Sequence, residues 1–278
     1  MAIYNRELNV CGIVHKYVEL TNNNSAEYIL VIVGWQSFKE IFYPLIEKSG
    51  QNYLIFDYLG TGDNKVKPAK ETLQQFKKLQ IEFVKAILEK HKVTKVIGTS
   101  ASTVFIASNP DLFAQQERTI YLFSPQLLKT PIDFILYVVF KFIDLLERFS
   151  NKSVYTKIVS SSFVKTKWAN IVGKNSRENI TIPYVVKGMV MSQKYWTTKH
   201  FYSFFNSKAH IKNKLPMLCK QNRLIYVIGK KDNLLDPVKT INFIEKYSIP
   251  GRYSVYNVEG NHVLELEALE EVIPIINK

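Results

Sequence analysis

The sequence predicts an α/β protein built on a doubly wound, mainly parallel sheet, with a helical segment inserted between two parts of the sheet. Two observations predict this class. Short runs of β-branched and aromatic residues, typical of strands buried on both faces, alternate with longer segments of helical periodicity. The alternation stops after residue 123 and resumes at residue 223. We therefore expect sheet residues 1–123, a helical cap of residues 124–222 and sheet residues 223–278.

The first part is expected to open with an antiparallel hairpin. Residues 2–20 hold two short apolar segments, and a cluster of turn-forming residues follows at 21–25. Continuous apolar runs then predict buried strands, and segments with apolar residues three to four positions apart predict helices between them. The strands are expected at 28–33, 52–57, 95–99 and 119–123, and the helices at 38–46, 71–91 and from 102 onward.

The helical cap is predicted where the strand pattern is interrupted. Residues 124–222 are aromatic and basic, and the stretch 131–149 is a strongly apolar helix pattern. This helix is either buried against a core or forms a lid whose apolar side lines a substrate pocket, with Phe134 and Val138 as lining residues; a helix on a membrane surface is a third interpretation. The sheet pattern then resumes, with strands at 223–228 and 252–258 and helices at 238–247 and 264–276.

Composition narrows the class of protein further. The chain has 278 residues, of which 46% are hydrophobic, so it can bury a sizeable core. Its net charge of +13 is spread along the whole chain, and no basic block alternates with stacking aromatic residues. We therefore expect no nucleic-acid partner, and at most weak contact with an anionic membrane or an acidic protein.

The cysteines and the first residues of the chain match no known metal, redox or targeting pattern. Cys11 and Cys219 have neither metal-ligand nor redox spacing, so we expect no metal ion and no cofactor. The sequence begins without a signal-peptide pattern, and no apolar run reaches the ~20 residues that a membrane-spanning helix needs. These observations predict a cytoplasmic protein.

One turn is the leading candidate for a catalytic site. The segment Gly98-Thr99-Ser100-Ala101-Ser102 lies between an apolar strand and an apolar helix. Such a turn pushes its apex side chain, here Ser100, out of the sheet and places it beside the N-terminus of the helix, which favours negative charge. It also lies at the C-terminal end of a strand, where open α/β sheets bind ligands. Small residues open many helices of this kind, so the motif needs partners elsewhere.

Two later loops supply those partners. A serine hydroxyl is a poor nucleophile near neutral pH, and needs a base that an acid holds in position. His262 follows the last predicted strand, and Asp232 follows the strand before it. Asp236 is the alternative acid, but its position directly before Pro237 is typical of a helix cap, so we prefer Asp232.

These motifs, in this order, resemble those of the α/β-hydrolase family. The turn is a near match to the family's G-x-S-x-G, with Ser102 in place of the second glycine. The loops before Asp232 and His262 resemble its G-x-x-D and G-x-H loops. The resemblance implies that Ser100 is the nucleophile, His262 the base and Asp232 the acid.

The resemblance also implies where an oxyanion would bind. In this family the two donors are backbone N–H groups, here those of Ala101 and of Trp35 in the loop Gly34-Trp35, with Gly34 beside the substrate. That loop departs from the family's usual His-Gly, because Val33 precedes Gly34. Of the remaining histidines, His200 could border the pocket from the cap side.

Three functions remain open at this stage. The first is hydrolysis of an ester or thioester of a hydrophobic acyl or aryl substrate through an acyl-enzyme, as by an esterase, thioesterase or lipase-like enzyme. The second uses the same triad for C–C or lactone hydrolysis, or for acyl transfer. The third is a non-catalytic protein of this fold that binds a small hydrophobic molecule.

Overall fold

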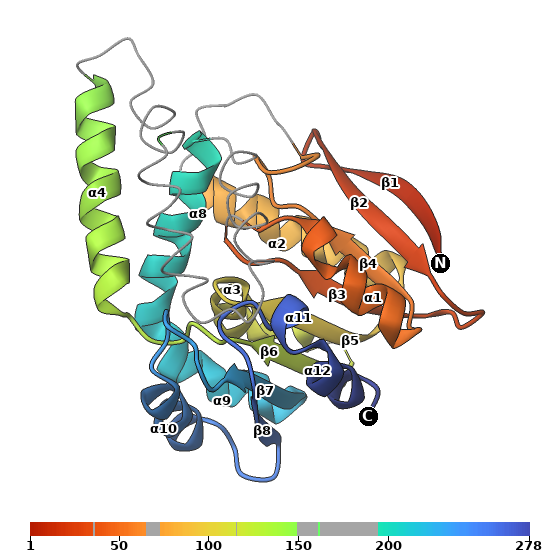
Figure 1. Cartoon of the computed structure of the whole chain (residues 1–278). Coiled ribbons are helices and arrows are strands. Elements are labelled where there is room, and N and C mark those ends of the chain that lie inside the picture. The colour runs from red at the N-terminus through yellow and green to blue at the C-terminus, as the bar shows by residue number, and fades with distance from the viewer. Residues whose placement is uncertain (36, 65–72, 115, 149–160, 162–193) are drawn as a thin grey trace.

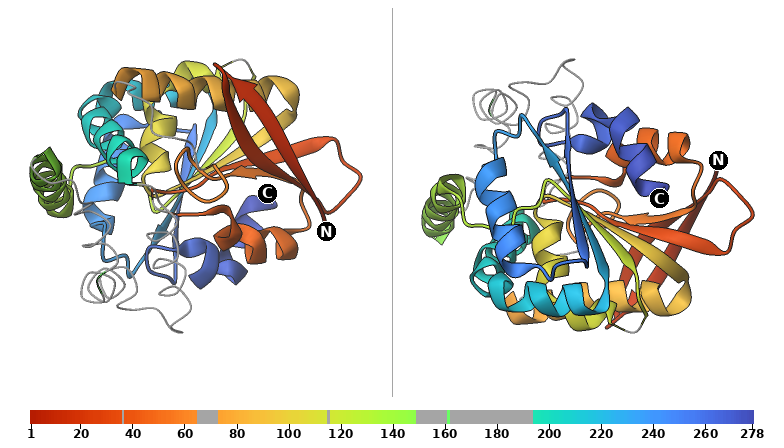
Figure 2. Two further views of the ribbon diagram at one scale, coloured as in Figure 1. Left: turned by 90° about the horizontal axis from the view of Figure 1, so that it is seen from above. Right: turned by 90° about the horizontal axis from the view of Figure 1, so that it is seen from below.

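The computed structural model describes residues 1–35, 37–64, 73–114, 116–148, 161 and 194–278. Within them one sheet holds eight strands, in the order β1-β2-β4-β3-β5-β6-β7-β8. Helices cover both faces of this sheet (Figures 1 and 2). The predicted doubly wound, mainly parallel α/β class is confirmed.

The predicted hairpin forms one edge of the sheet. Strands β1 (Ala2–Val10) and β2 (Ile13–Thr21) pair antiparallel, and β2 also runs antiparallel to β4 (Tyr53–Phe56). All other neighbours are parallel. Those strands are β3 (Glu27–Ile32), β5 (Lys92–Thr99), β6 (Thr119–Phe123), β7 (Arg223–Gly229) and β8 (Tyr253–Val258).

The central strands are buried on both faces, as their continuous apolar runs predict. Val31, Ile97, Tyr121 and Ile225 stand side by side on β3, β5, β6 and β7, and all four are almost wholly excluded from solvent. This in-register row makes the C-terminal ends of the parallel strands meet at one edge of the sheet. Loops that leave those ends can therefore contact one another.

Each face of the sheet has its own helices (Figure 2). On one face lie α1 (Tyr43–Ser49), α11 (Leu264–Glu267) and α12 (Leu269–Ile276). On the other lie α2 (Leu73–Lys90), α3 (Ser102–Ser108) and α9 (Ile211–Gln221), with α10 (Pro237–Tyr247) beside α9. Short 3-10 turns cover Lys39–Phe42, Pro110–Phe113 and Lys208–His210.

The segment predicted as a cap divides into two structural parts. Helix α9 packs on the sheet, because Ile211, Leu215 and Leu218 belong to the main core. Helices α4 (Pro131–Arg148) and α8 (Lys194–Ser207) instead share a separate apolar cluster of Phe140, Ile143, Phe201 and Phe205. The part that rises from the sheet is thus the α4–α8 pair. The rest of the expected 124–222 cap lies largely outside the described residues.

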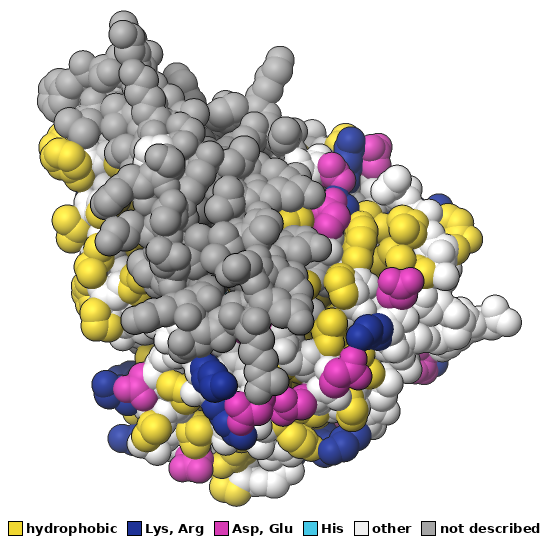
Figure 3. Space-filling model, viewed as in Figure 1, with side chains coloured by type: hydrophobic (Ala, Val, Ile, Leu, Met, Phe, Trp, Pro, Cys, Tyr) yellow, Lys and Arg dark blue, Asp and Glu magenta, His cyan; other side chains and the backbone are white. Residues whose placement is uncertain are grey.

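One side of α4 faces solvent with apolar side chains. Hydrophobic residues gather along the edge of the molecule where α4 lies (Figure 3), and they are Phe134, Ile135, Val138, Phe142 and Leu145. None of the helices in the described part of the chain is long and apolar enough to cross a bilayer.

Ser102, which replaces a glycine of the expected motif, ties the sheet to α3. Its side chain is fully buried. The hydroxyl accepts the Thr99 N–H at 2.7 Å and lies 2.7 Å from the carbonyl oxygen of Ile32 on the neighbouring strand, to which it can donate. The serine therefore adds a hydrogen-bonded link between β5 and β3 that a glycine could not make.

We predict that Ser102→Ala lowers the free energy of unfolding by about 1–3 kcal/mol, because it leaves buried backbone groups without a partner. Ser108→Ala on the same helix is the matched control. The Ser108 hydroxyl has no hydrogen-bond partner among the described residues, so its loss should not lower the free energy of unfolding. Urea unfolding of both variants tests this; equal losses would contradict it.

Candidate active site

Ser100 occupies a strained turn between β5 and α3. Its φ of 51° lies in the left-handed region that non-glycine residues avoid. The Ser100 N–H donates to Phe123 O at 2.8 Å, which anchors the turn to the end of β6. Gly98 permits the close approach of α3, because a Cβ there would lie 2.3 Å from the Ile106 side chain. The turn thus aims the hydroxyl away from the sheet.

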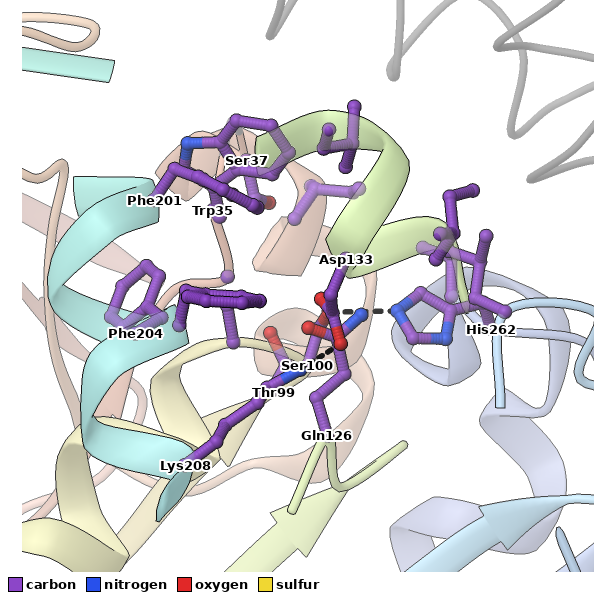
Figure 4. A pocket seen from close by; sticks show the side chains of 18 of the residues that line it. Trp35, Ser37, Thr99, Ser100, Gln126, Asp133, Phe201, Phe204, Lys208 and His262 are labelled. Atoms are coloured by element: carbon purple, nitrogen blue, oxygen red, sulfur yellow. Dashed lines mark hydrogen bonds and ion pairs between the residues drawn. The ribbon is translucent and has the colours of Figure 1, made fainter. Parts of the chain in front are cut away.

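Three side chains from separate loops form a continuous hydrogen-bonded chain. His262 Nε2 lies 2.7 Å from Ser100 Oγ, and His262 Nδ1 lies 2.8 Å from Asp232 Oδ2. Figure 4 shows Ser100 between the His262 ring and the aromatic side chains of α8. The structure therefore brings together the three residues expected to be nucleophile, base and acid.

The structure distinguishes between the two candidate acids. Asp232 is buried, and its second oxygen accepts the N–H groups of Leu234 and Leu235. Asp236 instead caps α10, with its side chain accepting the Lys239 N–H at 3.0 Å. Asp232 is therefore the carboxylate that contacts His262. Asp236 is the N-cap of α10, as its position before Pro237 predicted.

The acid loop and the histidine loop are bonded to each other. Lys231 N–H donates to Gly260 O at 3.0 Å, and Asn233 N–H donates to Asn261 Oδ1 at 3.1 Å. Gly229 allows this contact, because a Cβ there would lie 2.2 Å from Asn261 O. The distance between Asp232 and His262 is thus set by backbone contacts as well as by their own hydrogen bond.

Ser124 is a contributor that the motifs did not reveal. It follows β6 with a φ of 43°, and its hydroxyl donates to the backbone oxygen of His262 at 2.7 Å. Its N–H bonds to Val227 O on β7. Ser124 therefore holds the histidine loop against the sheet. Its only sequence signal was its place directly after a predicted strand.

The environment of His262 favours its protonated form. Burial disfavours the charge, but attraction and hydrogen bonding from Asp232, together with attraction from Glu265 and Glu267, outweigh burial and raise the pKa of His262 above its ordinary value. An imidazole that binds a proton more readily is a better acceptor of the Ser100 proton. Asp232 thus both orients the ring and stabilises the imidazolium.

The expected oxyanion donors lie next to the serine. Ala101 directly follows Ser100 at the start of α3, and the first N–H groups of a helix have no partner within it. The loop before the 3-10 turn Lys39–Phe42 comes close, since a Cβ at Gly34 would lie 3.3 Å from Ser100 Cβ. Gly34, Trp35 and Ala101 all line the cavity that Ser100 enters. Their placement matches the expectation, while their role in oxyanion binding stays a prediction.

The cavity above Ser100 is mainly apolar, with a volume of about 100 Å³. Its walls include Leu136 of α4, the α8 rings Phe201 and Phe204, and Leu234. The Trp35 ring packs against Phe140 and Phe201 at centroid distances of 5.8 and 5.4 Å, so it joins this wall to the α4–α8 cluster.

The structure does not place Phe134 and Val138 in this cavity. Both side chains are more than half exposed, on the outer side of α4. Ile132, Asp133 and Leu136 of the same helix line the cavity instead. The expected lining helix is therefore present, but a different side of it faces the cavity from the side that carries Phe134 and Val138.

A buried ion pair lines part of the cavity. Lys208 Nζ lies 2.8 Å from Asp133 Oδ2, and both side chains are less than a tenth exposed. Asp133 also accepts the N–H of Thr130 at 2.7 Å. Burial lowers the pKa of Lys208, and Asp133 opposes that shift. The pairing joins α4 to the 3-10 turn that follows α8. The two residues are 75 positions apart, and no sequence pattern predicted their contact.

Glu265 is a second buried acid at the site. It lines the cavity beside His262 and is only 4% exposed. Burial raises its pKa from an ordinary 4.5 to about 7, and His262 opposes this only in part. In the described part of the chain, no cluster of three or more His, Cys, Asp or Glu side chains could hold a metal ion.

We predict that Glu265 makes stability fall with rising pH. Between about pH 4.5 and 7 the folded protein keeps a proton on Glu265 that the unfolded chain releases, so its stabilising effect is lost across that window. Glu265→Gln should flatten this dependence and raise stability at pH 8 by up to about 3 kcal/mol. Urea unfolding at pH 4.5, 6 and 8 measures it. The exposed Glu270→Gln is the control and should leave the slope unchanged.

No protein-family model and no curated protein sequence matches the chain. Its fold does match solved structures. An esterase from Thermogutta terrifontis aligns with a TM-score of 0.73 at 11% identity, over 98% of this chain and 96% of that one. The enol-lactonase from Burkholderia xenovorans aligns at 0.71 and 11%, over 98% of both. The monoglyceride lipase from Saccharomyces cerevisiae aligns at 0.65 and 15%, over 100% and 95%.

These similarities agree with the eight-stranded, mainly parallel sheet and with the helices on both of its faces. At such low identity they report on architecture alone. The chain therefore has the α/β-hydrolase fold.

Proposed function

We propose that this protein is a serine hydrolase that cleaves an ester or thioester of a hydrophobic acyl or aryl substrate. One observation carries the proposal: the unbroken chain of hydrogen bonds from Asp232 through His262 to Ser100, at 2.8 and 2.7 Å. It ends on a strained serine at the floor of an apolar cavity. This arrangement can deprotonate a hydroxyl beside a bound carbonyl group.

The proposed reaction has two halves. Ser100 Oγ attacks the acyl carbonyl carbon while His262 Nε2 takes the hydroxyl proton, and the N–H groups of Ala101 and Trp35 bind the oxyanion. His262 then gives that proton to the leaving oxygen or sulfur, which leaves an acyl-Ser100 ester. Water, deprotonated by His262, attacks this ester, and the carboxylic acid and free serine are released.

The cavity supports the proposed substrate class. Its aromatic and aliphatic walls favour an apolar acyl or aryl group, and its volume of about 100 Å³ favours a short one. The comparison proteins are described as an esterase, a lipase and an enol-lactonase, so ester and lactone opening are the reactions to try first. Ranking aryl esters, thioesters and lactones by kcat/KM distinguishes these reactions from one another. A protein that only binds small molecules would turn over none of them.

We predict that Ser100→Ala abolishes both ester turnover and labelling by a serine-directed phosphonate. The reason is that Ser100 carries the one hydroxyl bonded to His262 in the described part of the chain. Ser37→Ala is the matched control. Ser37 also lines the cavity, but its hydroxyl has no partner among the described residues, so its loss should leave both readouts nearly unchanged. Labelling that persists in Ser100→Ala would exclude Ser100 as the nucleophile.

We predict that Asp232→Asn lowers kcat by about 10³–10⁴-fold, because the amide cannot orient the imidazole or stabilise its charge. In the wild type, kcat/KM should rise with pH through the raised pKa of His262, because only the neutral ring accepts a proton. Without the carboxylate, that rise should move to lower pH.

Asp236→Asn is the control for this variant. Asparagine also caps helices well, so stability and the pH profile should both stay close to those of the wild type. A pH–rate series for the three proteins measures the effect. The assignment of the acid fails if Asp236→Asn, and not Asp232→Asn, shifts the profile.

A further inference from the structure

The cavity above Ser100 contains a carboxyl group that the proposed reaction does not use. Glu265 lines this cavity, and its side chain is almost wholly enclosed by protein. It belongs to α11, the short helix that follows the loop of His262. The carboxyl therefore lies in the space that a substrate must enter, although it takes no part in the Asp232–His262–Ser100 chain of hydrogen bonds.

Nothing in the described part of the chain balances the charge of Glu265. The groups there that act on its carboxyl are its own backbone N–H, the His262 ring and the Glu267 carboxylate, and neither a lysine nor an arginine is among them. Its oxygens are not among the enclosed polar atoms that lack a partner, so they are open to the cavity that the residue lines. A ligand in the cavity can therefore reach them.

Asp133 offers a second acceptor to the same cavity. Its Oδ2 accepts from the Thr130 N–H, the Thr130 hydroxyl and Lys208 Nζ, at 2.7, 3.0 and 2.8 Å. Its Oδ1 is bonded to no residue that the structure describes, and it is likewise not an enclosed atom. Figure 4 shows the Asp133 side chain in the cavity that Ser100 enters. Two carboxyl groups thus have free acceptor positions there.

The charges that line the cavity leave an excess of negative charge once Glu265 is ionised. Lys208 and Asp133 offset each other, since they form an ion pair. Glu265 has no such counter-ion among the described residues, and burial raises its pKa to about 7, which shows that the protein alone stabilises the carboxylate poorly. A positive charge supplied by a ligand would stabilise it.

The remaining walls are compatible with a cationic ligand. The rings of Phe38, Phe201 and Phe204 line the cavity, and the face of an aromatic ring attracts a cation. An anionic ligand group would be repelled by Glu265, and a hydroxyl could donate a hydrogen bond but would leave the charge unbalanced. A protonated amine donates hydrogen bonds and balances the charge as well.

We propose that the substrate of the Ser100 site carries a protonated amine near its acyl carbonyl group, and that Glu265 selects this amine. The ammonium donates to the Glu265 carboxylate, with Asp133 Oδ1 as a further acceptor, and the carbon chain packs against the aromatic wall. Glu265 is thus a residue that determines specificity and moves no proton in the reaction. The inference rests on the proposed function, because the reacting group is taken to be an ester at Ser100.

Three phenyl esters of similar size test the inference. Phenyl 3-aminopropanoate is cationic, phenyl butanoate is its neutral counterpart, and monophenyl succinate is anionic. At pH 8, above the pKa of Glu265, kcat/KM should be at least about tenfold higher for the cationic ester than for the neutral one, because only the cation pairs with the carboxylate. The anionic ester should be the poorest substrate of the three.

Glu265→Gln tests the assigned residue, because glutamine keeps the shape of the side chain and removes its charge. This variant should lower the ratio of the two kcat/KM values, cationic over neutral, by about tenfold. Glu270→Gln is the control at an exposed position and should keep the ratio of the wild type. A ratio of two substrates does not depend on the fraction of protein that is folded, so misfolding cannot imitate the effect.

Binding to Ser100→Ala separates this inference from the proposed function. Calorimetric titration of that variant should show phenyl 3-aminopropanoate binding about tenfold more tightly than phenyl butanoate. If the wild type hydrolyses none of the esters but this preference in binding remains, the proposed reaction fails and the selection of an amine stands. Hydrolysis without a preference for the cationic ester, or a preference that Glu265→Gln retains, would overturn the inference and leave the proposed function in place.

Discussion

The hydrogen bond between His262 and Ser100 depends on a constraint of the whole sheet. Parallel strands in register end at the same edge, so loops far apart in sequence leave the sheet side by side. Ser100 and His262 are 162 residues apart, yet their side chains meet because β5 and β8 belong to one parallel array. Backbone bonds between the loops after β7 and β8 then hold Asp232 within reach.

The serine turn adds a local cost that its surroundings offset. A non-glycine residue keeps a φ of 51° only where contacts with surrounding residues stabilise that strained conformation. Here the Ser100 N–H is bonded to β6, and the Ser102 hydroxyl links β5 and β3 just behind the turn. Ser102, which stands in place of the second glycine of the motif, therefore adds hydrogen bonds behind the turn that carries Ser100.

Charge is buried around this site in two different ways. Lys208 and Asp133 form a buried ion pair, which joins α4 to the 3-10 turn that follows α8. Glu265 pairs with no cation among the residues that the structure describes, and burial raises its pKa to about 7.

Sequence alone determined the fold class, the positions of the strands along the chain and the three loops that carry Ser100, Asp232 and His262. These features depend on local patterns: continuous apolar runs, helical spacing and turn residues directly after strands. Tertiary structure alone decided which side of α4 faces the cavity, so Phe134 and Val138 lie outside it. It also decided that α9 packs on the sheet and that Lys208 meets Asp133. Each of these depends on how helices pack against one another. Periodicity does not specify this packing, because a helix that is apolar on more than one side does not show in its sequence which side will face the cavity.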